Sequence, residues 1–375
     1  MTEGVDRRRF LITAGMGAGA CLALGGSAIR LAASQVEGGM ASLKDRAAKK
    51  GLLYGSAVLQ RELTQDPAFA AVFPQQCDIM VPELELKWDH LRPTPTTWDF
   101  AGADWLSNYA QQNQMKFRGH TLVWQDALPS WFAGYINPQN AKELLLGHIS
   151  KVMGRYAGKV HSWDVVNEAI WPPDKRPDGL RDTPWLRNLG AGYIELAFRA
   201  AQQADPHALL TWNENWLEEE TALGDAKRAF FVQHLKDLLS RGVPIQAIGL
   251  QSHLIGDHNN IAGPHFRQFL GQIQDMGLKI LVTEMDVREG NLPNDINTRD
   301  QSIANIYYEY LSAVLANPAV IAVLTWGISD KYTWTAQSNP RADKAPVRPL
   351  PYDQNMTPKP AWGAIARAFD NAPSR

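Results

Sequence analysis

Side chains suited to acid–base chemistry and hydrogen bonding stand at the ends of several apolar runs in this chain. Each run is short, and a polar or aromatic group ends it. The groups are Glu83, His120 with Trp124, Asn167 with Glu168, Asn213 with Glu214, Gln251 with His253, Glu284 with Asp286, and Trp326. One such group alone is more often capped or ion-paired than catalytic. Their recurrence favours a shared rim with a chemical role.

Two glutamates of this rim, Glu168 and Glu284, suit the hydrolysis of a glycosidic bond. In that reaction one carboxylic acid protonates the leaving oxygen, while a second carboxylate stabilises or attacks the anomeric carbon. The pKa values of the two carboxyl groups must differ, so the side chains around each glutamate have to shift its pKa in a different direction. We expect His253 to donate a hydrogen bond to Glu284 and to be held by Asp286. Asn167 is expected to bind a sugar hydroxyl beside the reacting carbon.

A divalent metal site of the sugar isomerase type is the alternative chemistry for this rim. His120, Glu168, His253, Glu284 and Asp286 carry suitable ligand atoms, and zinc or manganese sites need several ligands directed at one point. The sequence contains no HxH or HExxH spacing, and the rim is rich in Trp and amide side chains. We therefore predict no metal ion and no other cofactor.

The runs that end in these side chains recur as part of a longer unit, in which a helical pattern follows each run. They begin at Leu52, Asp78, Lys116, His161, Ala208, Gln246, Lys279 and Ile321. The clearest helical patterns lie at residues 141–157, 191–204, 224–242 and 265–277. Gly242 and Gly277 stand where two of these helices should stop. Eight strand and helix units predict the α/β class and a single-domain (β/α)8 TIM barrel, whose active site lies at the carboxyl ends of the strands.

The beginning of the chain resembles an export segment. "RRRF" at residues 7–10 precedes a Gly-rich apolar stretch that is too short to span a bilayer stably. We predict a twin-arginine-type signal peptide over residues 1–33 and a glycoside hydrolase catalytic domain over residues 45–372. The protein would then use the twin-arginine export machinery, keep no stable membrane span, and be periplasmic or extracellular.

Composition limits the remaining classes of function. Hydrophobic residues make up 45% of the 375 residues and charged residues 20%, so a sizeable core can form. The net charge of −2 argues against a nucleic-acid partner, and 13 Trp suit contacts with sugar faces. Cys21 lies in the predicted signal peptide, so only Cys77 remains and no intramolecular disulfide is expected. Lipid attachment at Cys21 is less favoured, because leucine is missing three residues before it.

The motifs resemble those of glycoside hydrolase family 10, best known for endo-1,4-β-xylanases, from about Leu53 to Phe369. "WDVVNEA" around Glu168 is similar to the acid/base motif of that family, and "VTEMD" around Glu284 is similar to its nucleophile motif. "RGHTLVW", "IGLQSH", "WGISDKYTW" and "PLPYDQNMTPKPAW" also match, in the same order. The resemblance implies a retaining double-displacement mechanism, with Glu168 as acid/base and Glu284 as the nucleophile that forms a covalent glycosyl-enzyme.

The resemblance also implies which residues bind the polysaccharide. They are Glu83, Lys87, His120, Trp124, Gln251, Trp326 and Trp334. The first four would bind the sugars before the cleaved bond, on the glycone side. The last two would line the subsite of the sugar that reacts. Packed indoles there can exclude a hydroxymethyl group, which favours xylose over a sugar carrying that group by about 1–3 kcal/mol.

Several residues depart from the family pattern. "PELELKW" replaces "PENEMKW" and "VWQDALP" replaces "VWHSQLP", so Leu84, Gln125 and Ala127 stand for asparagine, histidine and glutamine. The loss of two hydrogen bonds, each worth about 0.5–1.5 kcal/mol net, would weaken the binding of plain xylan in the second glycone subsite. "NENW" puts Asn215 where a tyrosine is common.

The sequence therefore predicts an enzyme that hydrolyses internal β-1,4-xylosidic bonds of xylan, with a modified second glycone subsite. A decorated xylan, a β-glucan or an exopolysaccharide is the alternative substrate, because the same residues would cleave it. A non-catalytic sugar-binding barrel is the less favoured class, because both glutamates are present.

Overall fold

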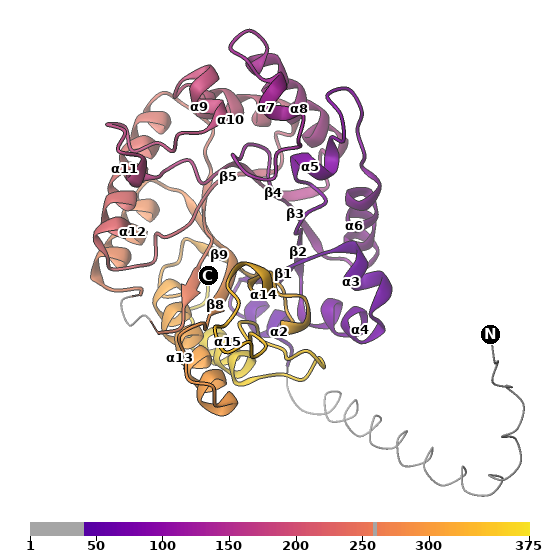
Figure 1. Ribbon diagram of the computed structural model, residues 1–375. Helices are drawn as coiled ribbons and strands as arrows, with labels where there is room; N and C mark the ends of the chain where they lie inside the picture. Colours follow the sequence, from indigo (N-terminus) through magenta and orange to yellow (C-terminus); the bar gives the residue numbers. More distant parts are fainter. Residues whose placement is uncertain (1–40, 258–260) are drawn as a thin grey trace, which may run out of the picture. The chain divides into compact units, whose positions relative to one another are not determined.

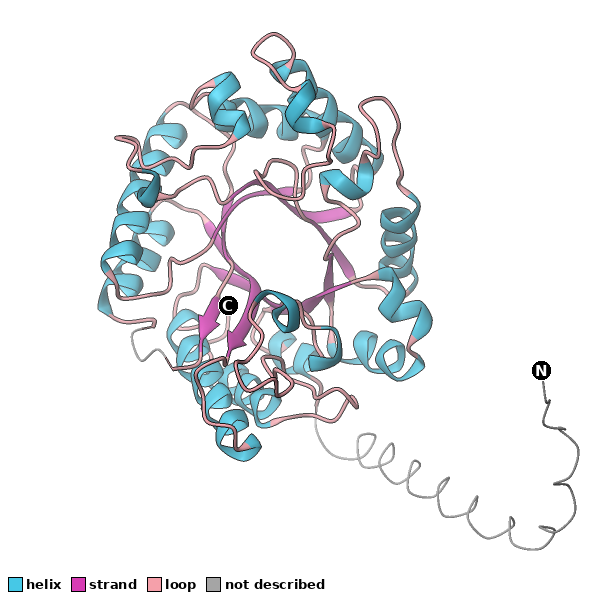
Figure 2. Cartoon of the chain, viewed as in Figure 1, coloured by secondary structure: helices cyan, strands magenta, loops and turns pink. Residues whose placement is uncertain are grey.

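Eight parallel strands close into a barrel in the computed structural model, which describes residues 41–257 and 261–375. They are β1 (Leu53–Val58), β2 (Ile79–Pro82), β3 (Lys116–Gly119), β4 (Val160–Asn167), β5 (Leu209–Glu214), β6 (Ala247–Leu250), β8 (Lys279–Arg288) and β9 (Val320–Thr325). Pairing of β6 with β8 and of β9 with β1 completes the ring. Figure 2 shows the strands inside and the helices outside. The predicted (β/α)8 barrel is confirmed.

Helices surround the strands and connect them (Figure 1). They are α2 (Leu43–Ala48), α3 (Gln60–Gln65), α4 (Pro67–Gln76), α5 (Trp88–Leu91), α6 (Ala101–Gln112), α7 (Phe132–Tyr135), α8 (Ala141–Arg155), α9 (Pro184–Leu189), α10 (Tyr193–Ala204), α11 (Ala222–Ser240), α12 (Pro264–Asp275), α13 (Ile296–Val314), α14 (Thr335–Ser338) and α15 (Pro360–Asn371), with short 3-10 turns η1 (Pro172–Asp174) and η2 (Asp330–Tyr332). Gly242 and Gly277 follow α11 and α12 with φ of 67° and 77°, the left-handed conformation that ends a helix. The two helix ends predicted from these glycines are confirmed.

The sixth strand ends earlier than its apolar run. β6 stops at Leu250, because Ser252 has a φ of 62°, which an extended strand cannot contain. The buried amide of Ser252 donates to Glu218 Oε1 at 2.7 Å instead of joining the sheet. His253 then begins a separate short strand, β7 (His253–Ile255), which pairs with the end of β8. The expectation that His253 ends the sixth barrel strand was therefore wrong, although it does lie beside the seventh.

The third strand is also shorter than its apolar run. β3 ends at Gly119, so His120 and Trp124 lie in the loop that follows. This loop stays beside β4, because the amide of Leu122 donates to the carbonyl of Asp164 at 3.0 Å.

One extra residue in β4 sets the direction of the side chains at its end. Asp164 and Val166 lie opposite Thr211 and Trp212, which are consecutive in β5. Such a bulge changes which face the following side chains use. Asp164 and Asn167 therefore both reach the polar network of the barrel mouth, although they are three positions apart and would face opposite sides of a regular strand.

Apolar side chains fill the barrel below that network. The inner cluster consists of Ala57, Ile79, Val81, Ala247, Leu281, Ala322, Leu324 and Trp326. A larger cluster packs the outer face of the strands against the helices. The polar groups at the carboxyl ends of the strands thus stand on a packed floor. Among the described residues, no helix is long and apolar enough to cross a membrane, and the predicted signal peptide lies outside these residues.

Candidate active site

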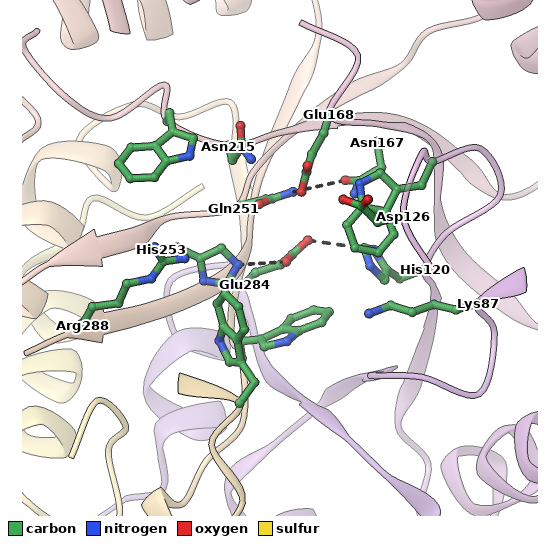
Figure 3. Close-up of a pocket in the computed structure, with 14 residues that line it drawn as sticks. Lys87, His120, Asp126, Asn167, Glu168, Asn215, Gln251, His253, Glu284 and Arg288 are labelled. Carbon is green, nitrogen blue, oxygen red and sulfur yellow. Dashed lines mark hydrogen bonds and ion pairs between the residues drawn. The ribbon is translucent and has the colours of Figure 1, made fainter. Parts of the chain in front are cut away.

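A cavity of about 310 Å³ opens at the carboxyl ends of the strands (Figure 3). Its lining consists of Lys87, His120, Trp124, Asp126, Asn167, Glu168, Asn215, Trp216, Gln251, His253, Glu284, Arg288, Trp326 and Trp334. Of the residues predicted for catalysis, support or binding, only Asp286 and Glu83 are missing from this lining. Asp286 is fully buried behind His253, and Glu83 is partly buried at the end of β2.

Glu284 projects from β8 and is almost completely buried. Its Oε1 accepts a hydrogen bond from Asn213 Nδ2 at 2.7 Å, and its Oε2 accepts one from His253 Nε2 at 3.1 Å. Burial by itself raises the pKa of Glu284, but the His253 hydrogen bond and the charges of His120 and His253 outweigh it, so the pKa lies below its ordinary value. The arrangement therefore keeps this carboxylate ionised, as a nucleophile requires.

His253 is held between two carboxylates. Its Nδ1 lies 3.0 Å from Asp286 Oδ1, and the other oxygen of Asp286 accepts a hydrogen bond from Trp334 Nε1 at 2.6 Å. Burial lowers the pKa of His253, yet Asp286 and Glu284 together raise it to about 10. The imidazole is therefore a cation that donates to both acids. These are the contacts predicted for His253 from the sequence.

Glu168 stands directly after β4 in a different environment. Its φ of 55° turns the chain out of the strand, and its amide donates to the carbonyl of Asn213 at 2.9 Å. Gln251 Nε2 donates to Oε1 at 3.0 Å, and Gln125 Nε2 donates to Oε2 at 3.1 Å. Arg181 Nε binds the backbone oxygen of Glu168 at 2.8 Å. Neutral amides thus donate to this carboxylate and Arg181 Nη2 lies 3.7 Å from its Oε2, whereas a cationic histidine donates a hydrogen bond directly to Glu284.

Three amide side chains connect the two glutamates. Asn167 Oδ1 accepts from Asn213 Nδ2 at 2.8 Å and from Gln251 Nε2 at 3.2 Å. These contacts fix the orientation of the Asn167 amide, and its buried Nδ2 has no hydrogen-bond partner among the described residues. Asn167 is therefore able to donate to a sugar hydroxyl, the role predicted for it.

A cation and aromatic rings line another part of the cavity. Lys87 Nζ lies 5.1 Å from the ring centroid of Trp124 and 5.8 Å from that of Trp326. His120 Nδ1 lies 2.9 Å from Asp164 Oδ2, so a buried carboxylate fixes this ring. Flat apolar rings beside donors of this kind suit a sugar, which has both apolar faces and hydroxyl groups.

Comparison with known proteins identifies the family. The model of the family described as "Glycosyl hydrolase family 10" matches residues 42–368, most of the chain. The chain belongs to glycosyl hydrolase family 10. It is 34% identical over 303 residues to endo-1,4-beta-xylanase B of Thermotoga neapolitana, covering 80% of this chain and 83% of that protein. It is also 34% identical to endo-1,4-beta-xylanase 3 of Hypocrea jecorina, over 84% of this chain and 82% of that one.

Solved structures of family 10 members have the same fold. Native xylanase 10B from Thermotoga maritima superposes with a TM-score of 0.79 and 32% identity, over 88% of this chain and 98% of that one. Xylanase 10B from Thermotoga petrophila, solved in complex with xylobiose, gives a TM-score of 0.80 at the same identity and the same coverage. The glycoside hydrolase predicted from the motifs is confirmed at the level of the family.

The residues that depart from the family 10 pattern take up contacts of their own. Gln125 binds Glu168 and is one of the supporting groups that sequence reasoning did not assign. Leu84 and Ala127 do not line the cavity, and the carbonyl of Ala127 accepts from the amide of Asp89 at 3.0 Å. Leu84 and Ala127 have no polar side-chain atoms to offer a sugar.

Several further side chains of this family 10 site were not assigned from the sequence. They are Asn213, Arg181, Gln125, Asp126, Trp216 and Arg288. Asn213 stands at the end of a predicted strand, so its place on the rim was available from the sequence. Arg181 lies in a long loop between β4 and α9, where no periodic pattern predicts a contact with Glu168.

One group of side chains in the described residues has the spacing of metal ligands. It consists of His120, Asp164 and Glu284, whose ligand atoms lie within 4.8 Å of one another. Both oxygens of Asp164 already accept hydrogen bonds from the guanidinium of Arg118. A cation beside those oxygens and the cationic His253 on Glu284 both oppose a bound metal ion.

Proposed function

We propose that this family 10 enzyme is a retaining endo-1,4-β-xylanase that hydrolyses internal bonds of xylan, with Glu168 as acid/base and Glu284 as nucleophile. The observation that carries the proposal is the contrast between the two carboxylates of one cavity. Glu284 is buried and accepts a hydrogen bond from a cationic histidine, whereas Glu168 accepts hydrogen bonds from neutral amides and has Arg181 only at 3.7 Å. The relatives named endo-1,4-beta-xylanase support the choice of substrate.

In the first step a carboxylate oxygen of Glu284 attacks the anomeric carbon of the reacting xylose. The bond from that carbon to the glycosidic oxygen breaks, and Glu168 transfers its proton to this oxygen. The product is a covalent glycosyl-enzyme, and the aglycone part of the chain leaves with a new hydroxyl group. His253 and Asn213 hold the attacking carboxylate in place, so little reorganisation accompanies the attack.

In the second step Glu168, now ionised, removes a proton from water. The oxygen of that water attacks the anomeric carbon and displaces Glu284, which returns to the carboxylate form. Two displacements at one carbon restore its original configuration. During both steps the free amide N–H of Asn167 donates to a hydroxyl of the reacting sugar, a contact that strengthens as charge develops on the ring.

The remaining predicted residues bind the substrate in this proposal. Lys87, His120 and Trp124 hold the sugars before the cleaved bond, with Glu83 supporting them from behind. Burial raises the pKa of Glu83 to about 7 against the opposing effect of the Lys87 charge. Trp326 and Trp334 wall the reacting sugar, and Gln251 holds Glu168.

Hydrolysis of linear xylan tests the proposal directly. Glu168→Ala should lower kcat by about 10²- to 10⁴-fold, as loss of a general acid does, and Glu284→Ala should lower it further. Nuclear magnetic resonance of the first product should show the β-anomer. Release of the α-anomer, or wild-type rates in Glu284→Ala, would contradict the assignment.

A substituted or different β-1,4-glycan is the second candidate substrate. Leu84 and Ala127 have no polar side-chain atoms, so a sugar in the second glycone subsite, beyond the lining of this cavity, would receive fewer hydrogen bonds than in family members with amides there. Kinetics on xylo- and cello-oligosaccharides of equal length distinguish the two. Activity on the cello-oligosaccharides with none on xylan would favour the second candidate.

We also infer export by the twin-arginine route, since residues 7–10 read "RRRF" ahead of an apolar stretch. Arg7→Lys together with Arg8→Lys should keep the precursor in the cytoplasm. Export of that double variant at the native rate would contradict the inference.

A further inference from the structure

Arg288 is a cation of the cavity lining that has no anionic partner among the described residues. It ends β8, four residues beyond Glu284. Within residues 41–257 and 261–375 no carboxylate forms an ion pair with it, and its buried Nε has no hydrogen-bond partner. A guanidinium carries five N–H donors, and leaving such donors unpaired away from water is costly. The side chain is therefore available to an acceptor that enters the cavity.

Two indole rings hold this guanidinium in the wall of the cavity. The Cζ of Arg288 lies 5.1 Å from the ring centroid of Trp334 and 5.9 Å from that of Trp216. Contacts of this kind use the ring face and leave the N–H edge of the guanidinium free. The nearby carboxylate of Asp286 is engaged through both oxygens, by His253 and by Trp334.

Arg288 and Lys87 lie on opposite sides of Glu284 in the cavity (Figure 3). Lys87 belongs to the glycone side in the proposed function. Arg288 and the short side chain of Asn215 therefore lie on the side that receives the leaving part of the polysaccharide. A plain xylan chain carries no charge that would match a guanidinium.

We propose that Arg288 forms a subsite for a carboxylate carried by the leaving part of the substrate, so that the enzyme favours xylan bearing uronic acid substituents. This proposal rests on the xylanase function proposed above. A guanidinium binds a carboxylate through two parallel N–H···O bonds, which a lysine or an amide cannot reproduce. The two indoles hold the guanidinium of Arg288 in place, so this side chain loses less conformational freedom when the carboxylate binds.

The test compares two substrates of equal bulk. One is a xylo-oligosaccharide with a single glucuronic acid branch, and the other is the same molecule after reduction of that carboxyl to a hydroxymethyl group. Their ratio of kcat/KM isolates the charge from the size of the branch. We expect the wild type to favour the acidic substrate about tenfold, and Arg288→Gln to bring the ratio close to one. Added salt should lower the wild-type ratio.

Lys279→Gln is the matched control. Lys279 is exposed at the other end of the same strand, so this change removes one positive charge far from the cavity and should keep the wild-type ratio. A wild-type ratio near one, or a high ratio that persists in Arg288→Gln, would overturn the subsite.

Failure of the proposed function gives a different result. If the wild type cleaves neither oligosaccharide, the xylanase assignment fails, and titration of the Glu284→Gln variant with both oligosaccharides still decides the subsite. Tighter binding of the acidic one, lost when Arg288→Gln is added, supports it. Equal binding of both refutes it.

Discussion

Replacing His253 with alanine should shift the acid limb of the pH profile to higher pH. In the native protein the imidazolium donates to Glu284 at 3.1 Å. Burial raises the pKa of Glu284, and this hydrogen bond makes the largest contribution to lowering it. A hydrogen bond to a charged group is worth about 1.5–3 kcal/mol, and about 1.36 kcal/mol changes an ionisation constant tenfold. Without His253, Glu284 should stay protonated to a pH about one or two units higher.

The assay is the pH dependence of kcat/KM, which reports ionisation in the free enzyme. A protonated Glu284 cannot attack, so the acid limb marks its titration. The histidine control is His265→Ala, because His265 is exposed and pairs with Glu220 and Asp225 away from the cavity. This control should keep the wild-type profile.

The opposite result is a His253→Ala variant that loses activity at every pH while its acid limb stays at the wild-type position. In that case His253 would only orient Glu284 and would not set its ionisation. Circular dichroism of both variants would confirm that the comparison is made between folded proteins.

Three other experiments, two on new variants and one on His253→Ala, test separate parts of the site. Gly249→Ala should lower kcat/KM at least about tenfold and cost about 1–3 kcal/mol of stability, because its Cβ would lie 2.0 Å from Asn213 Oδ1. Leu84→Asn with Ala127→Gln should lower KM for xylo-oligosaccharides about tenfold, since each restored hydrogen bond is worth about 0.5–1.5 kcal/mol. The third experiment measures Tm against pH. Protonated His253 stabilises the folded protein fully at pH values below about 6.5, the pKa of an unfolded histidine. This contribution is lost as the pH rises through about 10, the pKa of His253 in the folded protein. The Tm of His253→Ala should therefore fall less than that of the wild type over this range.

Each of these changes has a comparison that can contradict it. Gly271 lies in α12, where an added Cβ would meet open space, so Gly271→Ala should keep activity and add about 0.5–1 kcal/mol of stability. Unchanged activity in Gly249→Ala would show that Asn213 tolerates displacement. An unchanged KM in the double variant would remove the argument for a modified glycone subsite. Parallel loss of Tm with pH in wild type and His253→Ala would exclude the histidine as its cause.

The barrel could be predicted from the sequence because the spacing of apolar residues and the glycines that end helices are local signals. The ends of the strands could not, since they depend on contacts between distant residues. The case of β6 is clear, because Ser252 leaves the sheet to bind Glu218, which lies 34 residues earlier. Nothing in the run "QAIGLQSH" indicates that partner.

Most of the site residues could likewise be predicted from strand ends and motifs, and Figure 3 shows them around one cavity. The contacts of His253 followed from adjacent positions on neighbouring strands. The orientation of Asn167 did not, because it depends on Asn213 and Gln251 from two other strands or loops. Loop residues such as Arg181 also have no sequence spacing that indicates their partner.

The three amides between Glu168 and Glu284 have a consequence for proton movement. Hydrogen bonds link Asn167, Asn213 and Gln251 to one another and to the two glutamates, but amide side chains neither gain nor lose protons at ordinary pH. The chain of side-chain hydrogen bonds through these amides therefore cannot pass a proton from one acid to the other. A proton picked up by Glu168 has no relay through these groups to Glu284, so each carboxylate keeps its own charge while the other reacts.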